Sequence, residues 1–296
     1  MFSKRDRTTG EMLFGIFNAL FMIAMVLVVL APIWHILMAS LSDSTEILKA
    51  KGLLLIPKEF NLDSYRMVFK NPSILSGYRT TLIVVVLGTS LSVLLTSFGA
   101  YALSRKGVMW SSLVMKLIIV TMFVSGGMIP SYILISKWLN LDNTLWALIL
   151  PAVITPWNLT IMRTSFAGIP DGLIESARID GANDFTILFK IVMPVSKSIL
   201  AVMVLYYGVS YWNAWFGASL YIRDRALWPL QLVLREILIQ NNSTSMTETL
   251  AGATDKNVAE SIKYATIVVA TLPILCIYPL LQKHFVKGVM IGSIKG

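Results

Sequence analysis

The chain has 296 residues, of which 56% are hydrophobic and only 14% are charged, whereas about a quarter of the residues of a soluble domain are charged. This composition excludes an ordinary water-soluble domain and predicts a protein whose solvent is a lipid bilayer. In a soluble protein the net charge of +9 would suggest nucleic acid, but here the cations lie mostly between apolar segments. We therefore expect membrane lipid, and no nucleic acid, as their partner.

Six apolar runs follow one another along the chain, and each is long enough for a helical crossing, which needs about 20 apolar residues. The first is too long for the core of a signal peptide and is expected to be a retained helix. The pattern predicts an all-α, polytopic membrane protein with six transmembrane helices in a single domain, residues 1–296. The runs are 13–38, 80–103, 113–135, 145–162, 199–222 and 264–281.

The orientation of the chain follows from the excess of Lys and Arg in short cytoplasmic loops. Counted over all segments, the two sides carry equal numbers of cations, but long external segments contribute little to this rule. Three cations precede the first run, and Arg105 and Lys106 follow the second, whereas the short loop after the third run holds only Lys137. We expect both termini on the cytoplasmic side, with 282–296 as a cytoplasmic tail.

Several runs contain residues that disturb helices, which membrane proteins tolerate where neighbouring helices or a water-filled path satisfy the freed backbone groups. Two explanations for these Gly and Pro residues are equally good: they produce kinks that help the helices pack, or they belong to a pathway that moves during transport. These residues are Gly126, Gly127 and Pro130 in the third run, Pro151 and Pro156 in the fourth, and Pro273 and Pro279 in the sixth.

Acidic residues are absent from all six runs, although an ion-coupled transporter usually binds its proton or sodium ion through carboxylates at membrane depth. The sequence also contains no phosphate-binding loop, no His-Glu-x-x-His and no Cys/His cluster with metal-ligand spacing. We therefore expect no catalytic residues, no metal site and no directly bound cofactor.

The segment 163–198 is too polar at its centre to cross a membrane. Pro170 suits the first position of a helix, and Gly181 can close that helix in a left-handed conformation. Asn183 is a good cap for a second helix that ends at Pro194. These signals predict a helix over 170–180, a turn and a second helix on the inner membrane surface.

Within this segment Glu175 to Ala182 reads E-S-A-R-I-D-G-A, and I-V-M-P follows at 191–194. The pattern resembles the EAA loop of ATP-binding-cassette importer permeases, with Ser176 in place of an alanine and Met193 in place of a leucine. In that family the loop forms a coupling helix that inserts into a cleft of the ATPase subunit. The resemblance implies this ATPase-coupling role for Glu175, Ser176, Ala177, Asp180, Gly181 and Ala182.

The alternative for Glu175 alone is an ion pair with Arg178 at the i,i+3 spacing on a solvated helix, which stabilises a helix by a few tenths of a kcal/mol, roughly 0.2–0.5.

Four other segments, 126–132, 145–151, 161–164 and 228–236, resemble carbohydrate permeases of the maltose-permease class. The likeness is strongest to the oligosaccharide and polysaccharide branch, to which the second permease of an alginate importer belongs. It implies the fold of a type I ABC importer permease in the bacterial cytoplasmic membrane. It also implies three kinds of partner: a second homologous permease, two ATPase subunits that carry ATP and Mg²⁺, and an extracytoplasmic sugar-binding protein.

The C-terminal segment 282–296 is similar to the tails of this class, which can reach between the two ATPase subunits. Its basic, glycine-broken sequence is also compatible with a lipid-facing anchor.

The fifth run holds a dense aromatic set beside an amide, and aromatic faces suit the apolar faces of sugar rings while Asn can bond hydroxyls. An interfacial aromatic belt explains the same residues equally well. The candidate substrate-pathway residues are Tyr207, Tyr211, Trp212, Asn213 and Trp215. Arg223, Arg225 and Arg235 follow outside, where they could meet a binding protein, an anionic sugar chain or only water.

The function expected from these observations is that of the translocating subunit of an ATP-driven importer for an oligosaccharide or polysaccharide, an acidic one such as alginate included. Two alternatives stay open. One is an ion-coupled secondary sugar transporter, and the other is a membrane receptor or scaffold that binds a partner through 163–198 without transport.

Overall fold

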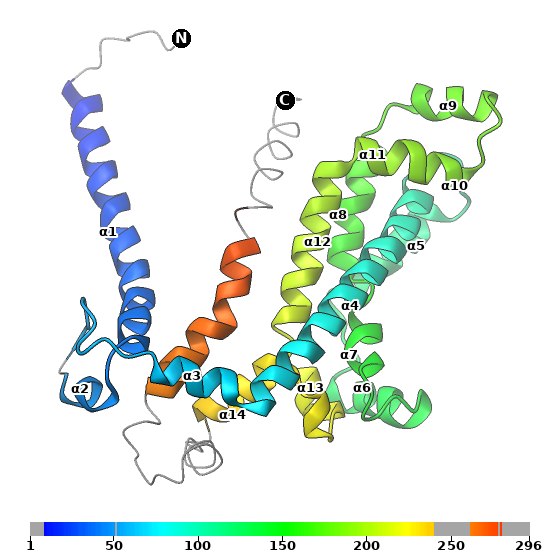
Figure 1. Cartoon of the computed structure of the whole chain (residues 1–296). Helices are drawn as coiled ribbons and strands as arrows, with labels where there is room; N and C mark the ends of the chain where they lie inside the picture. Colours follow the sequence, from blue (N-terminus) through cyan, green and yellow to red (C-terminus); the bar gives the residue numbers. More distant parts are fainter. Residues whose placement is uncertain (1–8, 51, 240–260, 278, 280–296) are drawn as a thin grey trace. The chain divides into compact units, whose positions relative to one another are not determined.

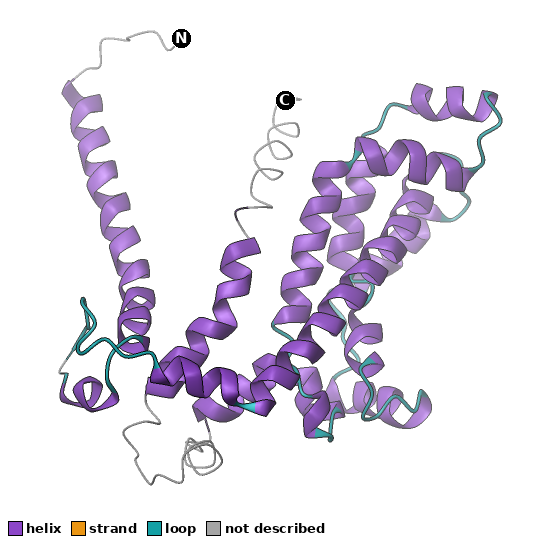
Figure 2. Ribbon diagram, viewed as in Figure 1, coloured by secondary structure: helices purple, strands orange, loops and turns teal. Residues whose placement is uncertain are grey.

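The computed structural model describes residues 9–50, 52–239, 261–277 and 279 (Figure 1). In this part of the chain the regular structure is helical, apart from one isolated bridge between Ser42 and Phe60 (Figure 2). The all-α prediction is therefore confirmed for these residues. They form two compact units, one within Met1–Asn71 and Ile237–Val269 and the other within Pro72–Glu236 and Ala270–Gly296.

The first unit begins with α1 (Thr9–Ser40), a 32-residue helix that is about 48 Å long at 1.5 Å per residue. Its apolar residues are exposed on all sides from position 9 to position 30, which suits a helix surrounded by lipid rather than by water. A polar segment with α2 (Ser44–Lys49) and α3 (Asp63–Lys70) follows. The amide of Leu54 donates to His35 Nδ1 at 3.0 Å, so this segment folds back on the end of α1.

The second unit is organised around α4 (Pro72–Ser104), which packs against α8 and α12. The other helices are α5 (Ser111–Val120), α6 (Met128–Ile133), α7 (Trp146–Ile149), α8 (Pro156–Ala167), α9 (Asp171–Ile179), α10 (Asp184–Ile187), α11 (Met193–Val195), α12 (Lys197–Trp212), α13 (Phe216–Tyr221) and α14 (Leu230–Ile239). Single π turns lie at Leu134–Trp138 and Leu188–Val192, and 3₁₀ turns at Leu150–Ala152 and Arg225–Leu227. The last described helix is Ser261–Ile277.

Two described helices, α1 and α4, are long and apolar enough to cross a bilayer as single helices. They match the first two predicted runs, and α4 begins eight residues earlier than 80–103 implies. The third and fourth runs are interrupted, as their Gly and Pro residues suggested: Gly127, with φ of +83°, precedes α6, and a 3₁₀ turn at Pro151 separates α7 from α8. The sixth run corresponds to Ser261–Ile277, and the predicted tail 282–296 lies outside the described residues.

The fifth run, 199–222, was expected to be one helix, and this expectation is wrong. Helix α12 ends at Trp212, and α13 starts only at Phe216. The side-chain amide of Asn213 donates to the carbonyl of Val209 at 3.0 Å. Such a local bond offers the backbone an alternative to continuing the helix. The helix is therefore interrupted at 213–215, although these residues include no Gly or Pro.

The packing of α4 against α12 depends on Gly88, where a Cβ atom would lie 2.8 Å from the ring of Tyr211. That ring has little freedom to move, because its hydroxyl group bonds to Ser92 at 3.0 Å and to the carbonyl of Ile149 at 3.1 Å. Gly208 on α12 is different, since the nearest atom to its Cβ would be Thr89 Oγ1 at 3.7 Å, an ordinary contact.

We expect Gly88→Ala to destabilise the second unit by about 1–3 kcal/mol, the usual cost of overpacking. Gly208→Ala adds the same methyl group to the facing helix and serves as the matched control with little effect. Thermal unfolding in detergent, followed by gel filtration of the soluble fraction, measures both variants. Equal melting temperatures for the two would contradict the close approach at Gly88.

Candidate coupling segment and substrate pathway

Helix α9 (Asp171–Ile179) exposes one face and buries the other. Ile174 and Ala177 are buried in the same hydrophobic cluster as residues of α4, α8 and α12, whereas Glu175 and Ser176 are exposed. The sequence suggested Pro170 as the first helical residue, but Pro170 occupies the N-cap position and the helix begins one residue later, at Asp171. The helix predicted over 170–180 is otherwise confirmed, and its exposed face is open to a partner.

The turn after α9 is closed by two backbone bonds, from the amide of Ala182 to the carbonyl of Ala177 at 2.9 Å and from Gly181 to Arg178 at 3.0 Å. This pair of bonds is a Schellman motif, which requires a left-handed residue after the helix. Gly181 supplies it with φ of +79°. The predicted role of Gly181 in closing the helix is therefore confirmed.

The second helix starts where Asn183 caps it, since Asn183 Oδ1 accepts from the amide of Thr186 at 2.8 Å. The helix continues through α10, the π turn Leu188–Val192 and α11 to Val195, so Pro194 lies within its last turn instead of ending it. The described helix pair Asp184–Val195 and Lys197–Trp212 is bent by 88°.

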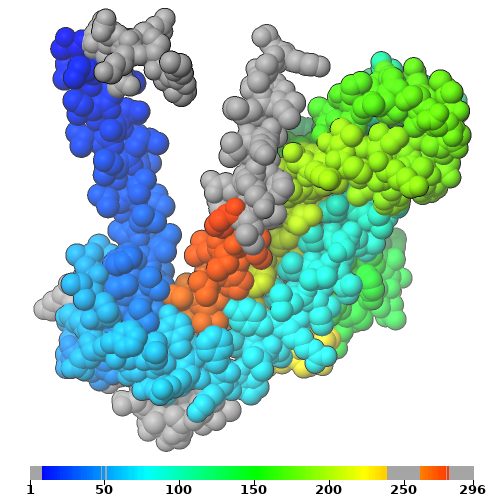
Figure 3. All heavy atoms as spheres, turned by 45° about the horizontal axis from the view of Figure 1, so that its top comes forward, coloured from blue at the N-terminus to red at the C-terminus, as the bar shows by residue number. Residues whose placement is uncertain are grey.

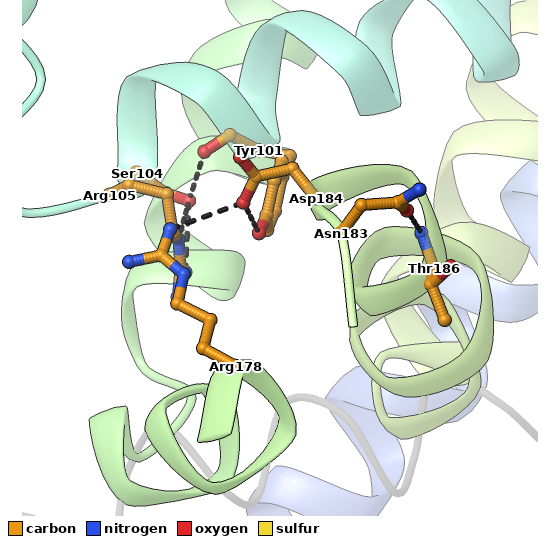
Figure 4. A network of polar contacts seen from close by, with 7 residues as sticks. All are labelled: Tyr101, Ser104, Arg105, Arg178, Asn183, Asp184 and Thr186. Carbon is orange, nitrogen blue, oxygen red and sulfur yellow. Dashed lines mark hydrogen bonds and ion pairs between the residues drawn. The ribbon is translucent and has the colours of Figure 1, made fainter. Parts of the chain in front are cut away.

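Asp184, the first residue of α10, connects this segment to the end of α4 (Figure 4). Its Oδ1 accepts from the hydroxyl of Tyr101 at 2.9 Å and from Arg178 Nη2 at 3.1 Å. These bonds, chiefly the one from Tyr101, hold the pKa of Asp184 below its usual value. The charged carboxylate therefore stabilises the folded segment at any pH above its ordinary pKa of about 3.9. This stabilisation is lost only as the pH falls through the lowered pKa.

Three more contacts join the end of α4 to α8 and to the first residue of α9. Arg105 Nη2 donates to the carbonyl of Phe166 at 2.6 Å, and Arg163 Nε donates to the carbonyl of Leu103 at 3.1 Å. Basic side chains commonly satisfy the free carbonyls at a helix C-terminus in this way. Lys106 and Asp171 form an exposed ion pair at 2.6 Å.

The exposed residues of the segment lie at one end of the second unit (Figure 3). Glu175 makes no ion pair with any described residue, because Arg178 bonds to Asp184 instead; the alternative of a Glu175–Arg178 pair is therefore not present. Large apolar side chains are also exposed here, among them Leu173 at 46%, Ile179 at 87% and Phe185 at 66%. The sequence does not single out these residues, because their spacing alone does not show which apolar side chains are exposed. Asp180 is likewise exposed, and Ala182 is half-buried.

Two of the candidate pathway residues hold helices together. Tyr207, which is 1% exposed, bonds through its hydroxyl to Thr96 Oγ1 at 2.8 Å and accepts from the amide of Thr155 at 3.2 Å. Tyr211 bonds to Ser92 and Ile149 as described above. Both rings are closed off from a ligand in this conformation, so their hydroxyl groups link α4, α12 and the chain around α7 and α8.

The other three candidates lie at the end of α12. Trp212 is buried and lines a mainly aliphatic cavity of about 540 Å³. Asn213 is exposed and Trp215 is half-buried, with the guanidinium carbon of Arg235 only 3.7 Å from the centre of the Trp215 ring. Asn213 and Trp215 are thus accessible, and Trp212 is not. No group of three or more potential metal ligands occurs among the residues that the structure describes.

Comparison with known proteins identifies the family. Residues 4–291 match the family described as binding-protein-dependent transport system inner membrane component. The chain belongs to this family. It is therefore a permease of the inner membrane that works with a binding protein and an ATPase, and it is not itself the catalytic subunit.

Three individual proteins show how close the relationship is. The polygalacturonan/rhamnogalacturonan transport system permease protein YtcP of Bacillus subtilis (strain 168) is 41% identical over 276 residues, which are 93% of this chain and 96% of the relative. The arabinooligosaccharides transport system permease protein AraQ of the same organism is 27% identical and covers 94% of both chains. A chain in the crystal structure of a bacterial ABC transporter involved in the import of the acidic polysaccharide alginate matches with a TM-score of 0.87 at 28% identity, covering 95% of this chain and 100% of that one.

We expect Asp184→Ala to lower the amount of substrate transported per ATP hydrolysed by several fold, because Tyr101 and Arg178 both lose their common partner. Asp171→Ala is the matched control, since Asp171 is also the first residue of its helix and forms an exposed ion pair, as Asp184 does with Arg178. The difference is that the buried Tyr101 donates to Asp184. Exposed pairs of this kind contribute little, so the control should stay within twofold of wild type. Uptake and ATP hydrolysis by the reconstituted complex give this ratio, and equal effects of the two changes would contradict a special role for Asp184.

Proposed function

We propose that this chain is one of two homologous transmembrane subunits in an ATP-driven importer of oligosaccharides released from a polysaccharide. It would span the inner membrane six times with both termini in the cytoplasm. Its partners would be the second permease, two ATPase subunits and an extracytoplasmic sugar-binding protein. The observation that carries the proposal is the α9–α11 segment, which has a free surface on one side and is bonded to α4 on the other.

The two sides of this segment suit a coupling element. Glu175, Ser176 and Asp180 offer polar contacts to an ATPase, and the exposed side chains of Leu173 and Ile179 offer an apolar surface that a partner can cover. On the inner side, Ile174 and Ala177 are part of the core that α4, α8 and α12 share. A displacement of α9 by the ATPase would therefore shift these helices and change the side of the membrane to which the pathway opens.

The substrate class follows from the relatives. YtcP, AraQ and the alginate importer are named for polysaccharides or oligosaccharides, and YtcP matches nearly the full length of this chain. The exposed Asn213 offers an amide for hydroxyl groups, and the half-buried Trp215 offers aromatic surface for a sugar ring.

The two alternatives are less well supported. An ion-coupled transporter would need an ion site at membrane depth, and family membership instead places the energy source on an ATPase. A receptor or scaffold would not transport sugar, and uptake by proteoliposomes that contain all partner subunits separates it from an importer.

Glu175→Lys should reduce both sugar uptake and sugar-stimulated ATP hydrolysis by at least about tenfold. Glu175 is exposed and forms no ion pair with the residues that the structure describes, so the reversed charge would meet the ATPase surface directly. Tenfold corresponds to a loss of about 1.4 kcal/mol of coupling free energy. Both activities are measured on the reconstituted complex, with co-purification of the subunits as the check on assembly.

Ser176→Ala is the matched control, because it installs the alanine of the family pattern on the neighbouring exposed position and should behave as wild type. Unchanged coupled transport in the Glu175→Lys complex would remove Glu175 from the mechanism.

A further inference from the structure

Arg223 and Arg225 follow α13, and Arg235 lies within α14. Figure 1 shows α13 and α14 at the end of the second unit opposite to α9. Two of these three arginines are neutralised within the chain. Arg223 Nη2 lies 2.8 Å from Asp142 Oδ2, and Arg225 forms an ion pair with Glu236. The third, Arg235, forms no ion pair with any residue in the described ranges, so its positive charge is available to an anion.

Arg235 is nevertheless held in one place. It is exposed on α14, and its guanidinium carbon lies 3.7 Å from the centre of the Trp215 ring. Stacking on an aromatic ring orients the planar guanidinium group while leaving N–H donors at its edge. A carboxylate can accept two parallel bonds from such an edge.

The position of Trp215 connects this pair to the pathway proposed above. Trp215 lies in the break between α12 and α13, two residues after the exposed Asn213. The amide nitrogen of Asn213 is bonded to Val209, which leaves its carbonyl oxygen as an acceptor for a hydroxyl group. The break between α12 and α13 thus supplies an aromatic surface and a hydroxyl acceptor, and the contact with Trp215 brings the cation of Arg235 on α14 to the same break.

We propose that Arg235, stacked on Trp215, binds the carboxylate of a uronic acid unit and makes this permease selective for acidic oligosaccharides. The inference rests on the proposed function as a sugar importer and adds to it the residue that recognises the charge. Arg235 forms a charge-assisted bond with the C6 carboxylate, and no bond forms or breaks in the sugar. A neutral sugar of the same size lacks this interaction and also leaves the guanidinium group unpaired.

The test compares trigalacturonate with its methyl ester, which has the same rings but no charge, in proteoliposomes that contain the complete importer. We expect Arg235→Gln to raise the KM for trigalacturonate about tenfold and to leave the KM for the ester unchanged. Arg235→Lys keeps the charge but loses the planar edge and should give an intermediate KM. The ratio of the two KM values does not depend on how much of the protein is active.

Arg223→Gln is the matched control, since it changes an arginine of the same region that already has a partner, and it should leave the ratio as in wild type. A parallel change in both KM values for Arg235→Gln, or no change in either, would overturn the assignment. A wild-type importer that takes up neutral but not acidic oligosaccharides would overturn the carboxylate site while the proposed function stands. Uptake of neither kind would overturn both.

Discussion

The hydroxyl groups of Tyr207 and Tyr211 are the contacts on which the second unit depends. In a membrane the hydrophobic effect does not drive helices together, so close packing and bonds between polar side chains must do so. Tyr207 bonds to Thr96, and Tyr211 bonds to Ser92, at 2.8 and 3.0 Å. These contacts lie a turn apart on both helices, and the approach at Gly88 brings the backbones close enough to form them.

Because α4 is joined to α12 in this way, its C-terminal end can serve as a fixed point for the segment that follows α8. Tyr101 lies on α4 after both tyrosine contacts, about one and a half turns beyond Thr96 and two and a half beyond Ser92, and bonds to Asp184. Arg105 and Arg163 complete the connection by donating to backbone carbonyls at the ends of α8 and α4. The α9–α11 segment is therefore attached to the same helix that the two tyrosines hold, and its exposed face remains free for a partner.

Local signals were enough to predict much of this arrangement. The cap at Asn183, the left-handed Gly181 and the long helices α1 and α4 each follow from the chemistry of a few adjacent residues. The bonds of Asp184, Tyr207 and Tyr211 join residues far apart in the chain, and a single sequence gives no indication of such pairs. The break at 213–215 was missed for another reason, because its cause is one asparagine side chain and not a glycine or proline. The exposure of Ile179 could not be foreseen from periodicity, since an apolar residue that faces a partner looks the same as one that faces the core.

The 88° bend between α11 and α12 determines how a movement at the surface would be converted. If the two helices ran in line, a sideways displacement of α9 would mainly tilt α12. Because the two helices are nearly perpendicular, the α10–α11 helix would act as a lever on the end of α12, and the same displacement would rotate α12 about its own axis. Rotation moves every side chain of α12 around the helix at once and needs no change in its depth in the membrane. A few ångströms of travel at the exposed face of α9 would in this way change which residues α12 presents to its surroundings, with the helix remaining intact.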